Sequence, residues 1–169
     1  MNKAFPLSFQ HFQKDIERYL KSEGKCEENE HGQTVYRGYQ AAVDQTFRAY
    51  MEKEAFAPLV AEFRKWNWEW DYNNYLLNLT ACLQVAGNWP LLKELWEAVI
   101  AKRRTNYNKT KKAQKALPEK IPEELVTKTR ELLLDSLYRL RSYASELQQE
   151  SEVGEYLEMI ARVEKRRKA

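Results

Sequence analysis

The chain has 169 residues, of which 31% are charged and 43% hydrophobic, and its formal net charge is +3. This length suffices for one domain with a buried core, and a net charge so close to zero does not by itself identify a partner. With only 5 glycines and 5 prolines, the composition argues against a β-sandwich, a barrel or a disordered chain. We therefore predict a single all-α domain over residues 1–169.

Cysteine content and hydropathy restrict where the protein works. The two cysteines, Cys26 and Cys82, are too few for a disulfide framework or a cysteine metal cluster. No apolar run approaches the roughly 18 residues of a membrane span, and no signal-peptide core follows Met1. We expect a soluble, cytoplasmic protein in a reducing environment, with no membrane partner and no cofactor.

Residues 1–33 are predicted to form one helix followed by a mobile polar loop. Ser8 is a suitable N-cap for a helix whose apolar stripe reaches Leu20 and which ends near Gly24. The polar stretch 21–33 has almost nothing to bury, so we expect a mobile connection. The sequence leaves open whether this helix packs on its own chain or on a second copy, and therefore whether the protein is a homo-oligomer.

Residues 34–101 are predicted to form two helical hairpins, because apolar residues recur there at three- and four-residue spacing. The first hairpin begins at Thr34 and turns at 55–58. The stretch 67–71 is expected to connect the two hairpins, with Asp71 as the cap of the helix that follows.

The second hairpin, from Tyr72 to Val99, has the better-defined turn. Gly87 can adopt the left-handed conformation that closes a helix, and Asn88 can cap the next helix. Beyond the turn, Trp96 shares a helix face with leucines, and we predict that it is buried between hairpins.

The two hairpins match each other in residue type at an offset of roughly 33 residues, a period typical of helical hairpins that must stack to bury their faces. The matched pairs are Tyr39 with Tyr72, Val43 with Leu76, Thr46 with Leu79, Phe56 with Trp89, Leu59 with Leu92, and Phe63 with Trp96. Over residues 36–102 the chain resembles the tetratricopeptide and pentatricopeptide repeat superfamily. The resemblance implies stacked antiparallel hairpins in a TPR-like α-α superhelix, with about six to seven helices in the whole chain.

The same resemblance implies a groove for a protein or peptide partner, because the first helices of successive repeats line a concave surface in that superfamily. The polar residues expected on this surface are Gln45, Arg48, Asn74 and Asn78. Such side chains can hydrogen bond to the backbone of an extended peptide. Simple exposure to solvent explains them equally well.

Residues 102–121 are predicted to form a basic connector. Between Lys102 and Lys120 the net charge is +7, with Glu119 as the only acid. The candidate residues for binding a phosphate or an acidic partner are Lys102, Arg103, Arg104, Tyr107, Lys109, Lys111, Lys112 and Lys115. Basic side chains neutralise phosphates, and Tyr107 could stack on an unpaired base. A solvated linker remains the alternative, since runs of like charge repel and extend.

Residues 122–169 are predicted to form a C-terminal helical hairpin. Glu123 suits a helix N-terminus, and an amphipathic pattern extends from Leu125 to Leu147. Ser151 is expected to cap the last helix, with apolar residues up to Val163 facing inward.

Motifs for catalysis are not evident in the sequence. It contains no phosphate-binding glycine loop and no zinc-protease motif, and its only histidines are His11 and His31. Cys26 and His31 lie in one polar stretch, but two ligands make a weak metal site, so we expect no metal. We predict a non-enzymatic helical-repeat adaptor for a protein or peptide partner. The alternative is a small nucleic-acid-binding subunit that uses residues 102–120.

Overall fold

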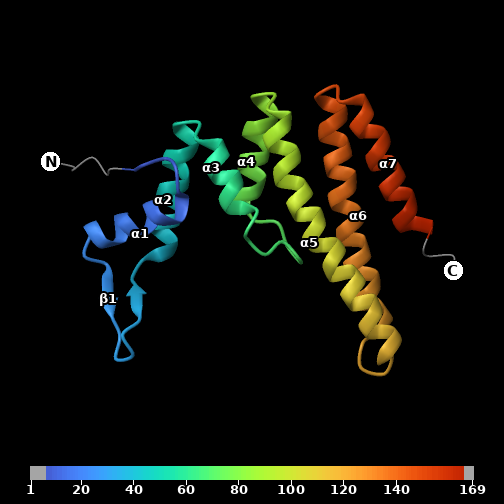
Figure 1. The fold of residues 1–169 in the computed structure, drawn as a ribbon, viewed down its shortest axis with the longest axis horizontal. Coiled ribbons are helices and arrows are strands. Elements are labelled where there is room, and N and C mark those ends of the chain that lie inside the picture. Colours follow the sequence, from blue (N-terminus) through green and yellow to red (C-terminus); the bar gives the residue numbers. More distant parts are fainter. Residues whose placement is uncertain (1–6, 166–169) are drawn as a thin grey trace. The chain divides into compact units, whose positions relative to one another are not determined.

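The computed structural model describes residues 7–165, and in this range the chain is all-α apart from one small sheet (Figure 1). The helices are α1 (Phe12–Ser22), α2 (Tyr39–Glu52), α3 (Phe56–Phe63), α4 (Asn74–Val85), α5 (Trp89–Ala116), α6 (Glu123–Glu146) and α7 (Glu150–Lys165), and the strands are β1 (Cys26–Glu28) and β2 (Thr34–Tyr36). The predicted all-α class is confirmed. None of the described helices combines the length and the apolar character needed to cross a membrane.

The chain divides between Lys65 and Trp66 into two compact units, whereas the sequence predicted one domain with internal boundaries after residues 33, 101 and 121. The N-terminal unit contains α1 to α3 and the sheet, and the C-terminal unit contains α4 to α7. Each unit has its own buried residues, and each is described below by itself.

In the N-terminal unit, α1 packs on α2 and α3 of the same chain. Phe12, Ile16 and Leu20 form the buried stripe of α1. The ring of Phe12 meets the edges of Tyr50 of α2 and Phe63 of α3, with centroid separations of 5.3 Å and 6.4 Å. These contacts settle the placement of α1, which the sequence left open.

A buried carboxylate joins α1 to α2. Asp15 has no exposed surface, and it accepts hydrogen bonds from the backbone N–H groups of Ser8 and Phe9, from the Ser8 hydroxyl and from the Tyr50 hydroxyl. The helix itself begins at Phe12. Ser8 therefore does not cap α1 as predicted, because its hydroxyl is engaged by the Asp15 carboxylate.

Asp15 is expected to make the stability of the N-terminal unit depend on acid pH. Burial alone would raise the pKa of Asp15, but hydrogen bonds from Tyr50 and Ser8 outweigh it and lower the pKa below its ordinary value of 3.8. A lowered pKa contributes stability that is present above the unfolded-state pKa and lost as pH falls through the folded-state pKa. In Asp15→Asn this loss below pH 3.8 should disappear, and stability at pH 7 should fall by about 1–3 kcal/mol.

Amide hydrogen exchange in α1 and α2, measured from pH 7 down to pH 2.5, would check this prediction. Glu17→Gln removes a half-buried carboxylate on the same helix and serves as the control. If Asp15→Asn and the unchanged protein lost protection over the same pH range, the buried carboxylate would not be the titrating group.

A β-hairpin replaces the mobile connection predicted for residues 21–33. The strands pair antiparallel, with Cys26 opposite Tyr36. The Asn29 side-chain oxygen accepts hydrogen bonds from the backbone of His31 and Gln33, and Gly32 has the positive φ that the turn requires. The residues from Thr34 therefore extend as a strand, and the next helix starts only at Tyr39.

In the C-terminal unit, the α4–α5 turn has the predicted chemistry. Gly87 has φ +63°, and the Asn88 side chain accepts a hydrogen bond from the backbone N–H of Leu91. The cap of α4 is Asn73, whose side chain accepts from Leu76, and not the predicted Asp71.

Two other predictions in the C-terminal unit need correction. Helix α5 continues to Ala116, so most of the predicted connector 102–121 is helical. Ser151 is the second residue of α7 and not a cap that precedes it. The predicted hairpin of α6 and α7 is present, and α6 packs extensively on both α5 and α7. Figure 1 shows α5 and α6 running side by side to the loop that joins them.

Candidate binding surface on α5

Helix α5 has one buried and one exposed side over the basic segment. Its buried side continues past Ile100 through three polar residues and one tyrosine, namely Arg103, Asn106, Thr110 and Tyr107. Its exposed side carries Arg104, Lys109, Lys112 and Lys115, while Lys102 and Lys111 are half-buried. The structure therefore separates the predicted binding residues into structural and accessible groups.

Arg103 is a structural residue with 1% of its surface exposed. Its Nε donates to the Trp68 carbonyl at 2.9 Å, and its Nη1 donates to the Leu132 carbonyl at 2.9 Å and to the Tyr72 hydroxyl at 2.8 Å. The guanidinium also lies 4.0 Å from the centre of the Tyr72 ring. Arg103 thus ties the 66–73 segment to α6, and it cannot contact a partner's phosphate as the sequence predicted.

The hydrogen bonds around Arg103 lead through Tyr72 to the carboxylate of Asp135. The Tyr72 hydroxyl donates to Asp135 Oδ2 at 2.7 Å, and Arg139 Nε lies 3.1 Å from the same oxygen. Burial raises the pKa of Tyr72, so the hydroxyl stays protonated and bridges Arg103 to Asp135. This link compensates part of the cost of burying the guanidinium charge.

Tyr107 is also removed from the candidate binding residues, because only 4% of its surface is exposed. A buried ring cannot stack on a base that arrives from solvent. Lys111 lies 6.0 Å from the centre of this ring. Lys102 donates to the Trp66 carbonyl, so it too has a contact within the unit.

The exposed cations of α5 form the accessible surface that remains, and we call Arg104, Lys109, Lys112 and Lys115 the α5 basic face. No acidic residue occurs in the sequence between Glu97 and Glu119. Among the described residues, none of these four cations lies within ion-pair distance of a carboxylate. Within the described part of the unit, no carboxylate therefore forms an ion pair with these cations.

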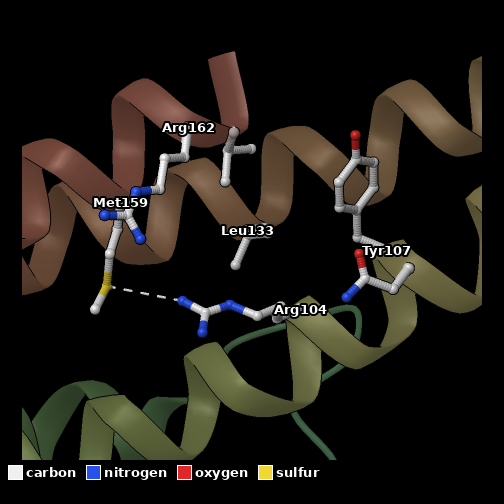
Figure 2. Close-up of a pocket in the computed structure, with 7 residues that line it drawn as sticks. Arg104, Tyr107, Leu133, Met159 and Arg162 are labelled. Carbon is white, nitrogen blue, oxygen red and sulfur yellow. Dashed lines mark hydrogen bonds between the residues drawn. The ribbon is translucent and has the colours of Figure 1, made fainter. Parts of the chain in front are cut away.

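A groove lies beside Arg104, between α5 and α7, and has a volume of about 260 Å³ (Figure 2). We call it the α5–α7 groove. It is lined by Arg104, Tyr107 and Asn108 of α5, Leu133 of α6, and Met159, Arg162 and Val163 of α7. Figure 2 shows Arg104 extending from α5 toward Met159, with Arg162 extending from α7. The predicted site included Arg104 but none of the α7 residues.

The residues predicted for a peptide groove lie on the first helices of the two hairpins. Gln45 and Arg48 are exposed on α2 in the N-terminal unit, and Asn74 and Asn78 are exposed on α4 in the C-terminal unit. On α4 they are accompanied by Leu77, which is 38% exposed. Each pair is accessible within its own unit, and a shared groove stays a prediction.

No group of three or more metal-binding side chains gathers anywhere in residues 7–165. Comparison of the chain with protein-family models, with curated proteins and with solved structures gave no significant match.

Proposed function

We propose that the chain is a non-enzymatic adaptor that binds an acidic segment of a protein partner on the α5 basic face. The observation that carries the proposal is the placement of four exposed cations on one side of a long helix, with no ion pair to a carboxylate of residues 7–165. The opposite side of that helix is anchored through Arg103. A rigid basic face of this kind attracts an acidic partner and orients it.

The burial of Tyr107 favours an acidic protein segment over nucleic acid. Proteins that bind single strands combine basic grooves with exposed aromatic rings on which bases stack, and the one aromatic ring among these cations is buried. Contacts to phosphates alone would bind nucleic acid without sequence preference. This alternative predicts that DNA binds at least as tightly as an acidic peptide of equal charge.

The repeat architecture also belongs to the proposal. Hairpin α2–α3 belongs to the N-terminal unit, and hairpin α4–α5 belongs to the C-terminal unit together with α6–α7. We propose that α2–α3 and α4–α5 are two TPR-like repeats that act as the scaffold of a cytoplasmic adaptor. Gln45, Arg48, Asn74 and Asn78 are then candidates for further contacts to a peptide backbone.

Replacing Lys109, Lys112 and Lys115 together by glutamine should weaken acidic-peptide binding without unfolding the protein. All three side chains are exposed, so each change should alter stability by about 0.5 kcal/mol or less. At low salt we expect about a tenfold loss of affinity for a fluorescein-labelled 12-residue poly-glutamate peptide, because three attractive charges disappear. Fluorescence anisotropy at several salt concentrations would measure the change.

The matched control replaces Lys14, Lys21 and Lys53, three exposed lysines of the N-terminal unit, by glutamine and so removes the same net charge. If this control lost as much affinity, the loss would depend only on the net charge of the protein, and this result would contradict a defined basic face. Tighter binding of a mixed-sequence DNA of equal charge would favour the nucleic-acid alternative.

A further inference from the structure

We infer that the α5–α7 groove is the anchor point of the partner, and that it binds a carboxylate side chain together with a neighbouring apolar side chain of the same segment. This inference rests on the proposed function and specifies the chemistry of the partner. It adds α7 to the proposed binding surface. It also predicts that the partner carries a short motif of acidic and apolar residues, and not acidic residues alone.

Two guanidinium groups supply the charge of the groove. Arg104 Nη2 lies 3.7 Å from the sulfur of Met159, and a thioether is only a weak acceptor for the five N–H donors of a guanidinium. Arg162 of α7 lines the same groove (Figure 2). The planar fork of arginine donors matches the two oxygens of a carboxylate. Asn108 lines the same groove and brings an amide that can donate to the same anion.

One internal carboxylate competes for the site. Arg162 Nη2 lies 3.4 Å from Glu158 Oε2, and both side chains are about three-quarters exposed. An exposed pair of this kind, four residues apart on a helix, contributes only about 0.3–0.5 kcal/mol. A partner's carboxylate that contacts both arginines can therefore displace Glu158.

The floor of the groove is apolar. Leu133 of α6 is fully buried beneath it, and Met159 and Val163 of α7 are partly exposed at its side. The flexible thioether of methionine adapts to apolar groups of different shapes. A volume of about 260 Å³ is below the range of roughly 300–1,000 Å³ for typical ligand pockets. The space therefore suits one or two side chains and not a large small-molecule ligand.

The test uses three fluorescein-labelled peptides of equal length, which alternate Glu with Leu, Glu with Gly, and Gln with Leu. The inference predicts that the Glu/Leu peptide binds about five- to tenfold more tightly than the Glu/Gly peptide, since only the former also fills the apolar floor. The Gln/Leu peptide should bind at least about tenfold more weakly than Glu/Leu, because it has no carboxylates.

Variants then locate the site. Arg104→Gln and Arg162→Gln should each weaken Glu/Leu binding by about tenfold, whereas Arg104→Lys should recover part of the loss because it keeps the charge without the fork. Lys120→Gln is the matched control, since it removes one exposed charge of the same unit that neither lines the groove nor belongs to the α5 basic face, and it should cost about twofold at most. Glu158→Gln should strengthen binding.

The failure of this inference differs from the failure of the proposed function. If Glu/Leu and Glu/Gly bound equally and Arg162→Gln matched Lys120→Gln, the groove would not be the anchor, although acidic segments would still bind. If none of the acidic peptides bound at low salt, the proposed function itself would fail. If inorganic phosphate displaced the Glu/Leu peptide at low millimolar concentration, the groove would be a phosphate site and the carboxylate assignment would be overturned.

Discussion

Replacing Arg103 by alanine is expected to destabilise the C-terminal unit by about 3–5 kcal/mol, the range for removing one member of a buried charged network. The change deletes the donors to Trp68, Tyr72 and Leu132. The Trp68 carbonyl loses the Arg103 Nε donor, whereas the Leu132 carbonyl keeps the Ser136 hydroxyl as a donor. A buried acceptor that loses a donor costs about 1–3 kcal/mol. Truncation also leaves a cavity between α5 and α6.

Tryptophan fluorescence measures this effect in the C-terminal unit alone. All five tryptophans of the chain belong to that unit, namely Trp66, Trp68, Trp70, Trp89 and Trp96. A urea titration followed by fluorescence therefore gives the free energy of unfolding of the unit that contains Arg103.

The next residue provides the control. Arg104→Ala removes an arginine from the same helix turn, but its side chain is exposed, so stability should change by about 0.5 kcal/mol or less. The two variants should therefore separate stability from binding, with Arg103→Ala unfolding early and Arg104→Ala losing affinity. Equal stability of both variants would contradict the structural role of Arg103.

The sequence predicted the elements whose signals are local. Gly87 and Asn88 define the α4–α5 turn through backbone conformation and capping, and neither effect depends on distant residues. The structure has both features at the predicted positions. Trp96 was likewise predicted to be buried from its spacing along one helix face, and it is.

The extent of α5 could not be derived from hydrophobic periodicity alone. The run of apolar residues stops at Ile100, and the buried positions that follow are polar except for Tyr107, beginning with Arg103. Their burial depends on acceptors such as the Leu132 carbonyl, which lies on another helix. The buried positions of α5 do keep their helical spacing through Asn106 and Thr110. A prediction based on this spacing, whether the residues are apolar or polar, would have extended the helix.

The β-hairpin and the α5–α7 groove were missed for different reasons. The strands have three residues each, too short for an alternating pattern to be recognised. The groove joins Arg104 to Arg162, which are far apart in sequence and on two helices. Only the packing of α5 and α7 on α6 brings such residues together, and no local pattern contains that information.

Trp96→Ala is expected to have an effect as large as that of Arg103→Ala, about 3–5 kcal/mol, as found for large buried aromatic residues. The indole is fully buried, its Nε1 donates to Thr80 Oγ1 at 3.0 Å, and its ring lies 5.4 Å from that of Tyr143. Thr80 belongs to α4 and Tyr143 to α6. Trp96 therefore joins the α4–α5 hairpin to the α6–α7 hairpin, as predicted for a residue between hairpins.

The measurement is a thermal unfolding transition followed by far-UV circular dichroism and by the fluorescence of the remaining tryptophans. For a unit of this size the midpoint should fall by at least about 10 °C. Trp70→Ala is the matched control, because this indole is 37% exposed and the Lys128 ammonium lies 5.5 Å from its ring centre. Such a cation–π contact contributes about 0.5–1 kcal/mol. A shift of only one or two degrees for Trp96→Ala would mean that the two hairpins do not depend on this ring for their packing. An intermediate result for Trp96→Phe, which keeps an aromatic ring but loses the donor to Thr80, would separate the contribution of packing from that of the hydrogen bond.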